Sequence, residues 1–306
     1  MLNLIVVVVE DDRQGVANFF LDLPHMVQMS NHARLRCHLL YHSLHNHGDY
    51  TFLIEHGSVN VRPVGPLNMN PEYFLHSVAR FLKTSYDAKA TNAFVFSGHC
   101  SHVFVRPFRR NLHPWMLVNL MEQQRMRFKF ILMDCCNTAC VETVYLYRNV
   151  TDFLVGCQSQ APMIGFLGPD FARILASRSP WPEKLRQLCD AFLARVNSHK
   201  SLHYTDCAVI TTKYAQEIPE LFSHAFYRNQ RARTTPSKEE RTVFDIVALM
   251  RWQKHLSADQ RQKMAEWVHR SVLYYQQCNQ LRRKAWAHKL HGISVVLNRD
   301  KEVKHF

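Results

Sequence analysis

Short apolar runs alternate with helical patterns over the first two-thirds of the chain, and this alternation limits the possible folds more than any other feature. The first run, "LIVVVV", is apolar without interruption and stops at Glu10, Asp11 and Asp12. A strand without polar positions is buried on both faces, as in parallel βαβ units with helices on each side of the sheet. Strands are therefore predicted at Leu4–Glu10, Arg34–His42, Ala93–Ser97, Phe128–Met133 and Asp152–Gly156.

Turn and helix signals complete this α/β pattern. The stretch 50–64 predicts a hairpin that turns at His56–Gly57. Helical patterns begin at Pro71, at Pro114 and after the cysteine-rich stretch, and another runs through 181–198. One more strand is expected at 206–212, then long helical patterns to about Leu290 and a late strand. We expect an α/β core over residues 1–213 and a mostly helical C-terminal region over 214–306 that packs on it, with a final strand near 292–297.

The composition is that of an ordinary globular protein, with 47% apolar and 21% charged residues. The net charge of +13 gathers in 228–233 and 280–289. No nucleic-acid-binding motif accompanies it, so a solvated basic surface is favoured over a nucleic-acid partner. No apolar run reaches the ~18 residues of a membrane helix, and no signal peptide is visible. Nine irregularly spaced cysteines fit reduced thiols. We expect an intracellular protein without a membrane partner; the sequence leaves its compartment and oligomeric state open.

Two neighbouring strands end in residues that can perform chemistry. The run at 93–97 leads into Gly98 and His99, and the run at 128–133 leads into Asp134, Cys135 and Cys136. Functional residues collect at the carboxyl ends of parallel strands. A thiolate is the attacking form of cysteine, and a nearby imidazole can shuttle its proton. Backbone N–H groups in these turns could form an oxyanion hole, and a helix that begins after Cys136 would favour the thiolate.

The cysteines allow other interpretations. Cys135, Cys136 and Cys140 form no CxxC pair, and no second pair lies at zinc-site spacing, so a metal site is not favoured. A disulfide between adjacent cysteines is strained. Cysteine is also a common small core residue, which is the interpretation that we favour for Cys135 and Cys140. Cys136 differs because of its position beside His99.

Around these residues the chain resembles the caspase-type cysteine peptidases. "FVFSGHC" is similar to their His-Gly motif and "FILMDCC" to their Asp-x-Cys motif. Further segments resemble the clostripain family in the same order, namely 67–82, 151–166, 204–226 and 291–297. The resemblance covers almost the whole chain. It implies a caspase-like α/β/α sandwich with a mainly parallel central sheet and a helical C-terminal portion, acting as a cysteine endopeptidase on peptides or proteins.

The resemblance also assigns roles to residues. Cys136 would be the nucleophile and His99 the general acid and base, with backbone groups of Gly98 and Cys100 at the oxyanion hole. Asp134 would form the floor of the pocket for the residue before the cut bond, together with Cys157 and Gln158. That pocket takes Arg or Lys in the family, because a carboxylate pairs with either cation. From the residues alone, Asp134 could instead cap the following helix.

Two departures from the family pattern stand out. Cys100 replaces the glycine that usually follows the histidine. The loop 156–165 holds no acid, so a second pocket carboxylate would have to come from Asp170 or elsewhere.

The resemblance also bears on processing, cofactors and activity. Relatives are often self-processed between the His and Cys strands, where Arg109 and Arg110 lie in a basic stretch. No metal or cofactor is expected; calcium dependence is possible by resemblance, but no loop has calcium-ligand spacing. Cys100 and the charge motivate an alternative, an inactive homologue that acts as a protein-binding or regulatory module.

Overall fold

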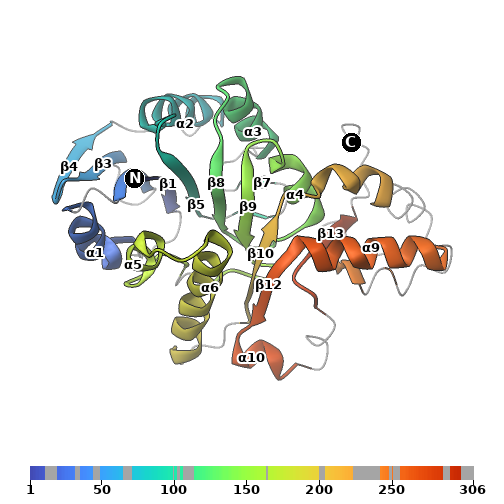
Figure 1. Ribbon diagram of the computed structural model, residues 1–306. Helices are drawn as coiled ribbons and strands as arrows, with labels where there is room; N and C mark the ends of the chain where they lie inside the picture. The colour runs from blue at the N-terminus through green and yellow to red at the C-terminus, as the bar shows by residue number, and fades with distance from the viewer. Residues whose placement is uncertain are drawn as a thin grey trace.

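A nine-stranded sheet forms the centre of the protein in the computed structural model (Figure 1). The structure describes residues 1–10, 19–31, 35–43, 49–64, 71–98, 100–101, 104–105, 114–162, 165–199, 204–222, 242–247, 250, 256–284 and 290–297. The strand order is β12-β10-β9-β8-β5-β1-β2-β3-β4. In chain order these strands are β1 (Leu2–Glu10), β2 (Leu35–Ser43), β3 (Asp49–Glu55), β4 (Ser58–Pro63), β5 (Thr91–Ser97), β8 (Phe128–Asp134), β9 (Thr151–Gly156), β10 (Asp206–Thr211) and β12 (Val272–Gln277).

Five neighbouring strands, from β2 to β9, are parallel, so their carboxyl ends share one edge of the sheet. The β3–β4 hairpin continues the sheet antiparallel on one side, and β10 and β12 do so on the other. The hairpin turns at His56 and Gly57 as predicted. Both residues have positive φ, 49° and 73°, which is the conformation of a tight hairpin turn that follows the twist of the strands.

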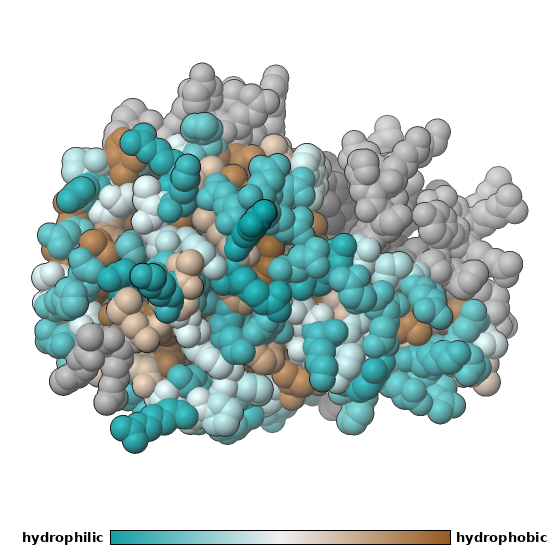
Figure 2. Space-filling view, turned by 45° about the horizontal axis from the view of Figure 1, so that its top comes forward, coloured by the Kyte–Doolittle hydropathy of each residue, from teal (hydrophilic) through white to brown (hydrophobic). Residues whose placement is uncertain are grey.

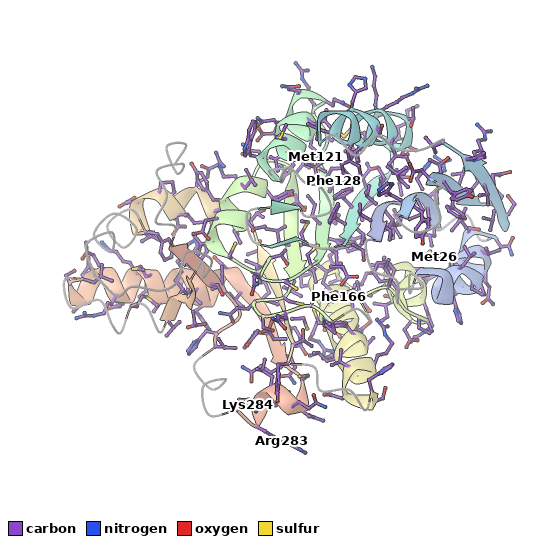
Figure 3. All side chains as sticks on the ribbon, turned by 180° about the vertical axis from the view of Figure 1, so that it is seen from behind. Met26, Met121, Phe128, Phe166, Arg283 and Lys284 are labelled. Atoms are coloured by element: carbon purple, nitrogen blue, oxygen red, sulfur yellow. The ribbon has the colours of Figure 1, made fainter. Side chains whose placement is uncertain are left out.

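Helices cover both faces of the sheet. One face carries α2 (Pro71–Ser85), α3 (Pro114–Gln123) and α4 (Val141–Tyr147); the other carries α1 (Phe19–Asn31), α5 (Phe171–Ala176) and α6 (Trp181–Ser198). Figure 3 labels Met121 and Phe128 in the first core and Met26 and Phe166 in the second. Two cores explain the unbroken apolar run of β1, since Ile5, Val7 and Val9 enter one core and the intervening residues the other.

The C-terminal region both covers the core and extends its sheet. The helix α9 (Ala258–Ser271) anchors Trp267, which is fully buried and donates its indole N–H to the Tyr214 carbonyl at 2.8 Å. Next come β12, the short helix α10 (Asn279–Arg282) and β13 (Ser294–Leu297), which pairs with β11 (Thr242–Asp245). Further described elements are a 3-10 turn at Ala215–Glu217 and the strand pair β6 (Cys100–Ser101) and β7 (Phe104–Val105).

The expectation of long helical patterns up to about Leu290 was wrong at β12. Its residues "VLYYQQ" follow α9 directly and pair antiparallel with β10. The two tyrosines favour a strand, and the ladder along β10 supplies the hydrogen bonds that decide it. The helices α1 and α5 were also not predicted.

The surface in Figure 2 is mainly hydrophilic, with apolar residues in small scattered patches. Within the described part of the chain, every helix is too short or too polar to cross a membrane.

Candidate active site

Cys136 lies in a turn directly after β8, at the carboxyl edge of the sheet. It is half-buried, whereas Cys135 and Cys140 are 1% and 0% exposed and belong to the core. Of these three thiols, only Cys136 therefore reaches the surface at a strand end. We call residues 135–140 the Cys136 turn.

The helix behind this turn begins after the cysteine-rich stretch, as predicted, but not directly after Cys136. Asn137 has φ of 55°, a left-handed conformation that interrupts a right-handed helix and that asparagine tolerates better than most residues. The helix α4 starts at Val141 with Cys140 at its N-cap. Its positive end is therefore not adjacent to Cys136. The alternative role of Asp134 as a helix cap is also wrong, since Asp134 ends β8.

The register of β5 and β8 aligns the residues that precede His99 and Cys136 in the sequence. Ser97 of β5 pairs with Asp134 of β8 in parallel register. His99 and Cys136 each follow that pair by two residues, although His99 itself lies outside the described residues. Gly98 lies close to β1, where an added Cβ would be 2.9 Å from the Val9 carbonyl.

The backbone groups assigned to the oxyanion hole are in part engaged elsewhere. The N–H of Gly98 donates to the Asp134 carbonyl at 3.4 Å, continuing the sheet ladder. The backbone of Cys100 pairs with Val105 in the small β6–β7 ladder. A direct oxyanion contact from Gly98 would therefore require this N–H to leave the Asp134 carbonyl.

Backbone groups of the loop after β9 hold the Cys136 turn. The Cys136 thiol lies 3.4 Å from the Ala161 nitrogen and 3.8 Å from its carbonyl oxygen. The N–H of Asn137 donates to the Ser159 carbonyl at 2.8 Å, and the N–H of Ala139 donates to the Cys157 carbonyl at 3.0 Å. These contacts fix the thiol at the surface of the loop 157–161.

Asp134 points under a second loop. Its Oδ2 accepts from the Ser97 hydroxyl at 3.0 Å and from the Phe166 N–H at 3.2 Å. Arg195 of α6 supports that loop by donating to the carbonyls of Gly165 and Phe166, at 2.7 and 3.0 Å. Burial raises the pKa of Asp134 to about 6, and the Phe166 N–H, the Ser97 hydroxyl and the Arg195 charge oppose that rise only in part. Gly165 has φ of 60°, and a Cβ there would lie 2.6 Å from Oδ2.

The two other residues assigned to the pocket are interior. Cys157 and Gln158 are 0% and 3% exposed, so their side chains do not face a surface pocket. Gln158 donates to Asp245 at 2.9 Å and accepts from the Gly292 N–H at 2.9 Å. The sequence analysis placed Gln158 in the substrate pocket, whereas in the structure its buried amide holds the C-terminal region. Contact with a substrate here would have to come from their backbone.

Other polar residues complete the picture. Asp170, considered as a second pocket acid, pairs on the surface with Arg173 at 2.6 Å. The sequence assigned no role to Asp206, Asp245 and His291, which join the loop after β9 to the C-terminal region. Asp206 and His291 lie in segments that resemble the family, 204–226 and 291–297, whereas no motif marks Asp245. Among the residues that the structure describes, no group of three or more His, Cys, Asp or Glu side chains could hold a metal ion.

The parallel sheet, its two helical layers and the thiol turn at its carboxyl edge define a caspase-like α/β fold. This is the fold of the C11, or clostripain-family, cysteine proteases, which confirms the fold expected from the resemblance. The chain is similar to a secreted C11 cysteine protease from Bacteroides thetaiotaomicron in complex with an irreversible peptide inhibitor. The TM-score is 0.73 at 12% identity, covering 98% of this chain and 94% of that one.

Two further solved structures agree. An inactive zymogen C11 protease from Parabacteroides distasonis has a TM-score of 0.71 at 12% identity, with 98% and 92% of the two chains covered. A second structure of a secreted C11 cysteine protease from Bacteroides thetaiotaomicron, called iotapain, has a TM-score of 0.70 at 14% identity, with 96% and 92% covered. No protein-family model matches the chain, and no curated protein is significantly similar to it.

Proposed function

We propose that the protein is a cysteine endopeptidase with Cys136 as its nucleophile and His99 as its general acid and base. One observation carries the proposal: the half-buried thiol of Cys136 lies just past a strand end. Ser97 and Asp134 are paired in the parallel register, and His99 and Cys136 each follow their member of this pair by two residues. The shared fold of the C11 proteases supports it. A cysteine thiol activated by an imidazole is a nucleophile suited to peptide hydrolysis.

The reaction proceeds through an acyl-enzyme. His99 takes the thiol proton, and the Cys136 sulfur attacks the carbonyl carbon of the scissile bond. The intermediate collapses as the C–N bond breaks, and His99 gives its proton to the leaving amine. Water, deprotonated by His99, then attacks the thioester and releases the new carboxylate and the thiol. The backbone N–H of Cys136 stabilises the oxyanion, since the N–H groups of Asn137 and Ala139 already donate to the loop after β9. The thiolate supplies the nucleophile, so we propose that no metal ion takes part.

The first test uses wild type and Cys136→Ala. We expect wild type to cleave peptides, to be alkylated selectively at Cys136 and to retain its activity in a chelator. The variant should neither cleave peptides nor be alkylated at position 136.

We also propose self-cleavage at Arg109–Arg110, a stretch outside the described residues. Wild type should then give two fragments on a denaturing gel and the variant one chain. Hydrolysis that survives Cys136→Ala would rule out the mechanism, and calcium-restored activity after chelation would rule out a metal-free one.

We further propose that cleavage follows Arg or Lys, with Asp134 as the acidic residue of the pocket. Its buried carboxylate beneath Gly165 and Phe166 supports this, since a basic side chain beside it would gain a charge-assisted hydrogen bond. Asp134→Asn should lower kcat/KM for Arg and Lys peptides by about tenfold or more relative to peptides with a neutral residue there. An unchanged ratio between basic and neutral peptides would exclude this role.

A second candidate function is an inactive homologue that binds peptides or proteins. The contact of the Cys136 thiol with the Ala161 backbone favours it, because an inactive site could keep such a contact permanently. The substitution at Cys100 points the same way. Binding of a basic peptide without turnover and without selective thiol labelling would identify this function.

A further inference from the structure

A buried carboxylate connects the C-terminal region to the loop beside Cys136. Asp245, at the end of β11, is 7% exposed. Its Oδ2 accepts from the His291 backbone N–H at 2.7 Å and from the Gln158 amide at 2.9 Å. Its Oδ1 accepts from Nδ1 of His291 at 2.9 Å and from the Val247 N–H at 3.0 Å. The contact with Oδ1 is a hydrogen bond from His291 in the tautomer that carries its proton on Nδ1. Each oxygen therefore receives two donors.

Gln158 passes this connection on. Its Nε2 donates to Asp245, and its Oε1 accepts from the Gly292 N–H. The chain at Gly292 has φ of 86°, and an added Cβ would lie 2.8 Å from Tyr275. Only glycine fits at this position. We call His291–Ser294 the C-terminal strap.

The strap reaches the Cys136 turn directly. The N–H of Ser294 donates to the Ala139 carbonyl at 3.0 Å, and Ser294 forms a parallel bridge with Cys140. On the opposite side, the loop after β9 accepts the N–H groups of Asn137 and Ala139. The Cys136 turn is thus held between the strap and this loop, and the Gln158 side chain joins the two.

A second carboxylate fixes the same loop. Oδ1 of Asp206 accepts from the N–H groups of Gln158 and Ser159, at 2.7 and 3.2 Å. The carbonyl of Ser159 in turn accepts from Asn137, the residue after Cys136. The backbone of Gln158 is therefore held by Asp206, and its side chain by Asp245.

We infer that Asp245 is a positioning residue for Cys136: by fixing Gln158 and the strap, it holds the Cys136 turn in the geometry for attack. The inference rests on the proposed peptidase function. Asp245 contacts Gln158, Val247 and His291 and acts through these residues. A displacement of about 1 Å in a reacting group can lower a rate by about a hundredfold, so an indirect support of this kind has a measurable effect.

The test compares Asp245→Asn and Gln158→Leu with a matched control, Asp152→Asn. An asparagine at 245 replaces one of the two carboxylate oxygens with an NH₂ group. In either orientation of the amide, this NH₂ group faces a backbone N–H donor, that of His291 or that of Val247. Asp152 is also a carboxylate that binds two donors, Arg127 at 2.7 Å and Lys129 at 2.9 Å, but it lies at the opposite end of β9. Hydrogen exchange at the amides of Asn137 and Ala139, alkylation of Cys136 and peptide hydrolysis are measured for each.

We expect both network variants to exchange these amides about tenfold faster and to lose about tenfold in kcat and in the alkylation rate, with KM within about twofold. Asp152→Asn should match wild type in all three measurements. Unchanged exchange, unchanged kcat, or an equal effect in Asp152→Asn would overturn the inference. If Asp245→Asn does not fold, Gln158→Leu decides alone, since it leaves Asp245 bound to the strap. If wild type cleaves no peptide, the proposed function fails, and the exchange and alkylation rates still decide whether Asp245 holds the turn.

Discussion

The carboxyl group of Asp134 changes its charge within the pH range of an ordinary assay. Its pKa is raised to about 6 by burial, and burial raises the pKa of Asp206 to about 6 as well. Each folded-state value lies above the ordinary value of 3.8. Between pH 3.8 and about 6, each of these carboxyl groups keeps a proton in the folded chain that it has lost in the unfolded chain. The free energy of unfolding therefore falls as pH rises through this interval.

Asp134→Asn should remove its share of this dependence. An asparagine can place its carbonyl oxygen where Oδ2 accepts from Ser97 and Phe166, so both hydrogen bonds can remain. We expect the loss of stability between about pH 4.5 and about pH 7 to be smaller than in wild type by about 2 kcal/mol. Urea unfolding at the two pH values measures it. An equal loss in both proteins would show that Asp134 does not titrate in this window.

At the residue scale, the sequence predicted the position of the candidate thiol but not its surroundings. Strand-end position distinguished Cys136 from Cys135 and Cys140, and burial of the latter two bears this out. The pattern after the cysteines located the start of α4 to within two residues, and the exact residue was not predictable because its N-cap, Cys140, makes no side-chain cap hydrogen bond and is not a typical capping residue. The only sequence signal for the left-handed backbone at 137 is the asparagine itself, which tolerates that conformation but does not require it.

Among the helices, α9 has the clearest local cause. Ser257 accepts from the Gln260 N–H at 3.1 Å, and the Gln260 side chain accepts from the Ser257 N–H at 2.9 Å. This reciprocal pair is a capping box, which satisfies two N–H groups that a helix start otherwise leaves without partners.

Removing the cap should destabilise the protein without affecting the Cys136 turn. We expect Ser257→Ala to lower the free energy of unfolding by about 1 kcal/mol. Ser198→Ala is the control, because its hydroxyl binds a carbonyl in the last turn of α6, so we expect a loss of only about a few tenths of a kcal/mol. Thermal and urea unfolding of both variants measure the difference. Equal losses would mean that the capping box adds no specific stability.

Elements were predictable where their pattern was local. The strands of the parallel sheet and the hairpin were found because buried strands read as continuous apolar runs and the turn contains glycine. By contrast, the sequence predicted a helix at β12. Its pairing with β10 is a tertiary contact, which local propensity cannot predict. Pro24 lies inside α1, and an internal proline argues against a helix in the sequence.

Over the whole molecule, the sheet was predictable and the support of the site was not. Alternation of strands and helices implies a parallel sheet with functional residues at one edge. Asp245 is separated from Gln158 by 87 residues and from His291 by 46 residues. Contacts at such distances leave no periodicity or motif, so only the fold reveals them. The interior placement of Gln158 follows from the same contacts.

The C-terminal strap has a consequence for the order in which the site forms during synthesis. Gly292 follows Gln158 by 134 residues. At about 5–20 residues per second, a ribosome needs on the order of 10 s to add that length. Throughout this time the nascent chain already carries Cys136, but the strap that closes its turn has not been made. The turn is therefore supported on one side only until the strap has been synthesised, and under the proposed function this delay would protect the nascent chain and its neighbours from early cleavage.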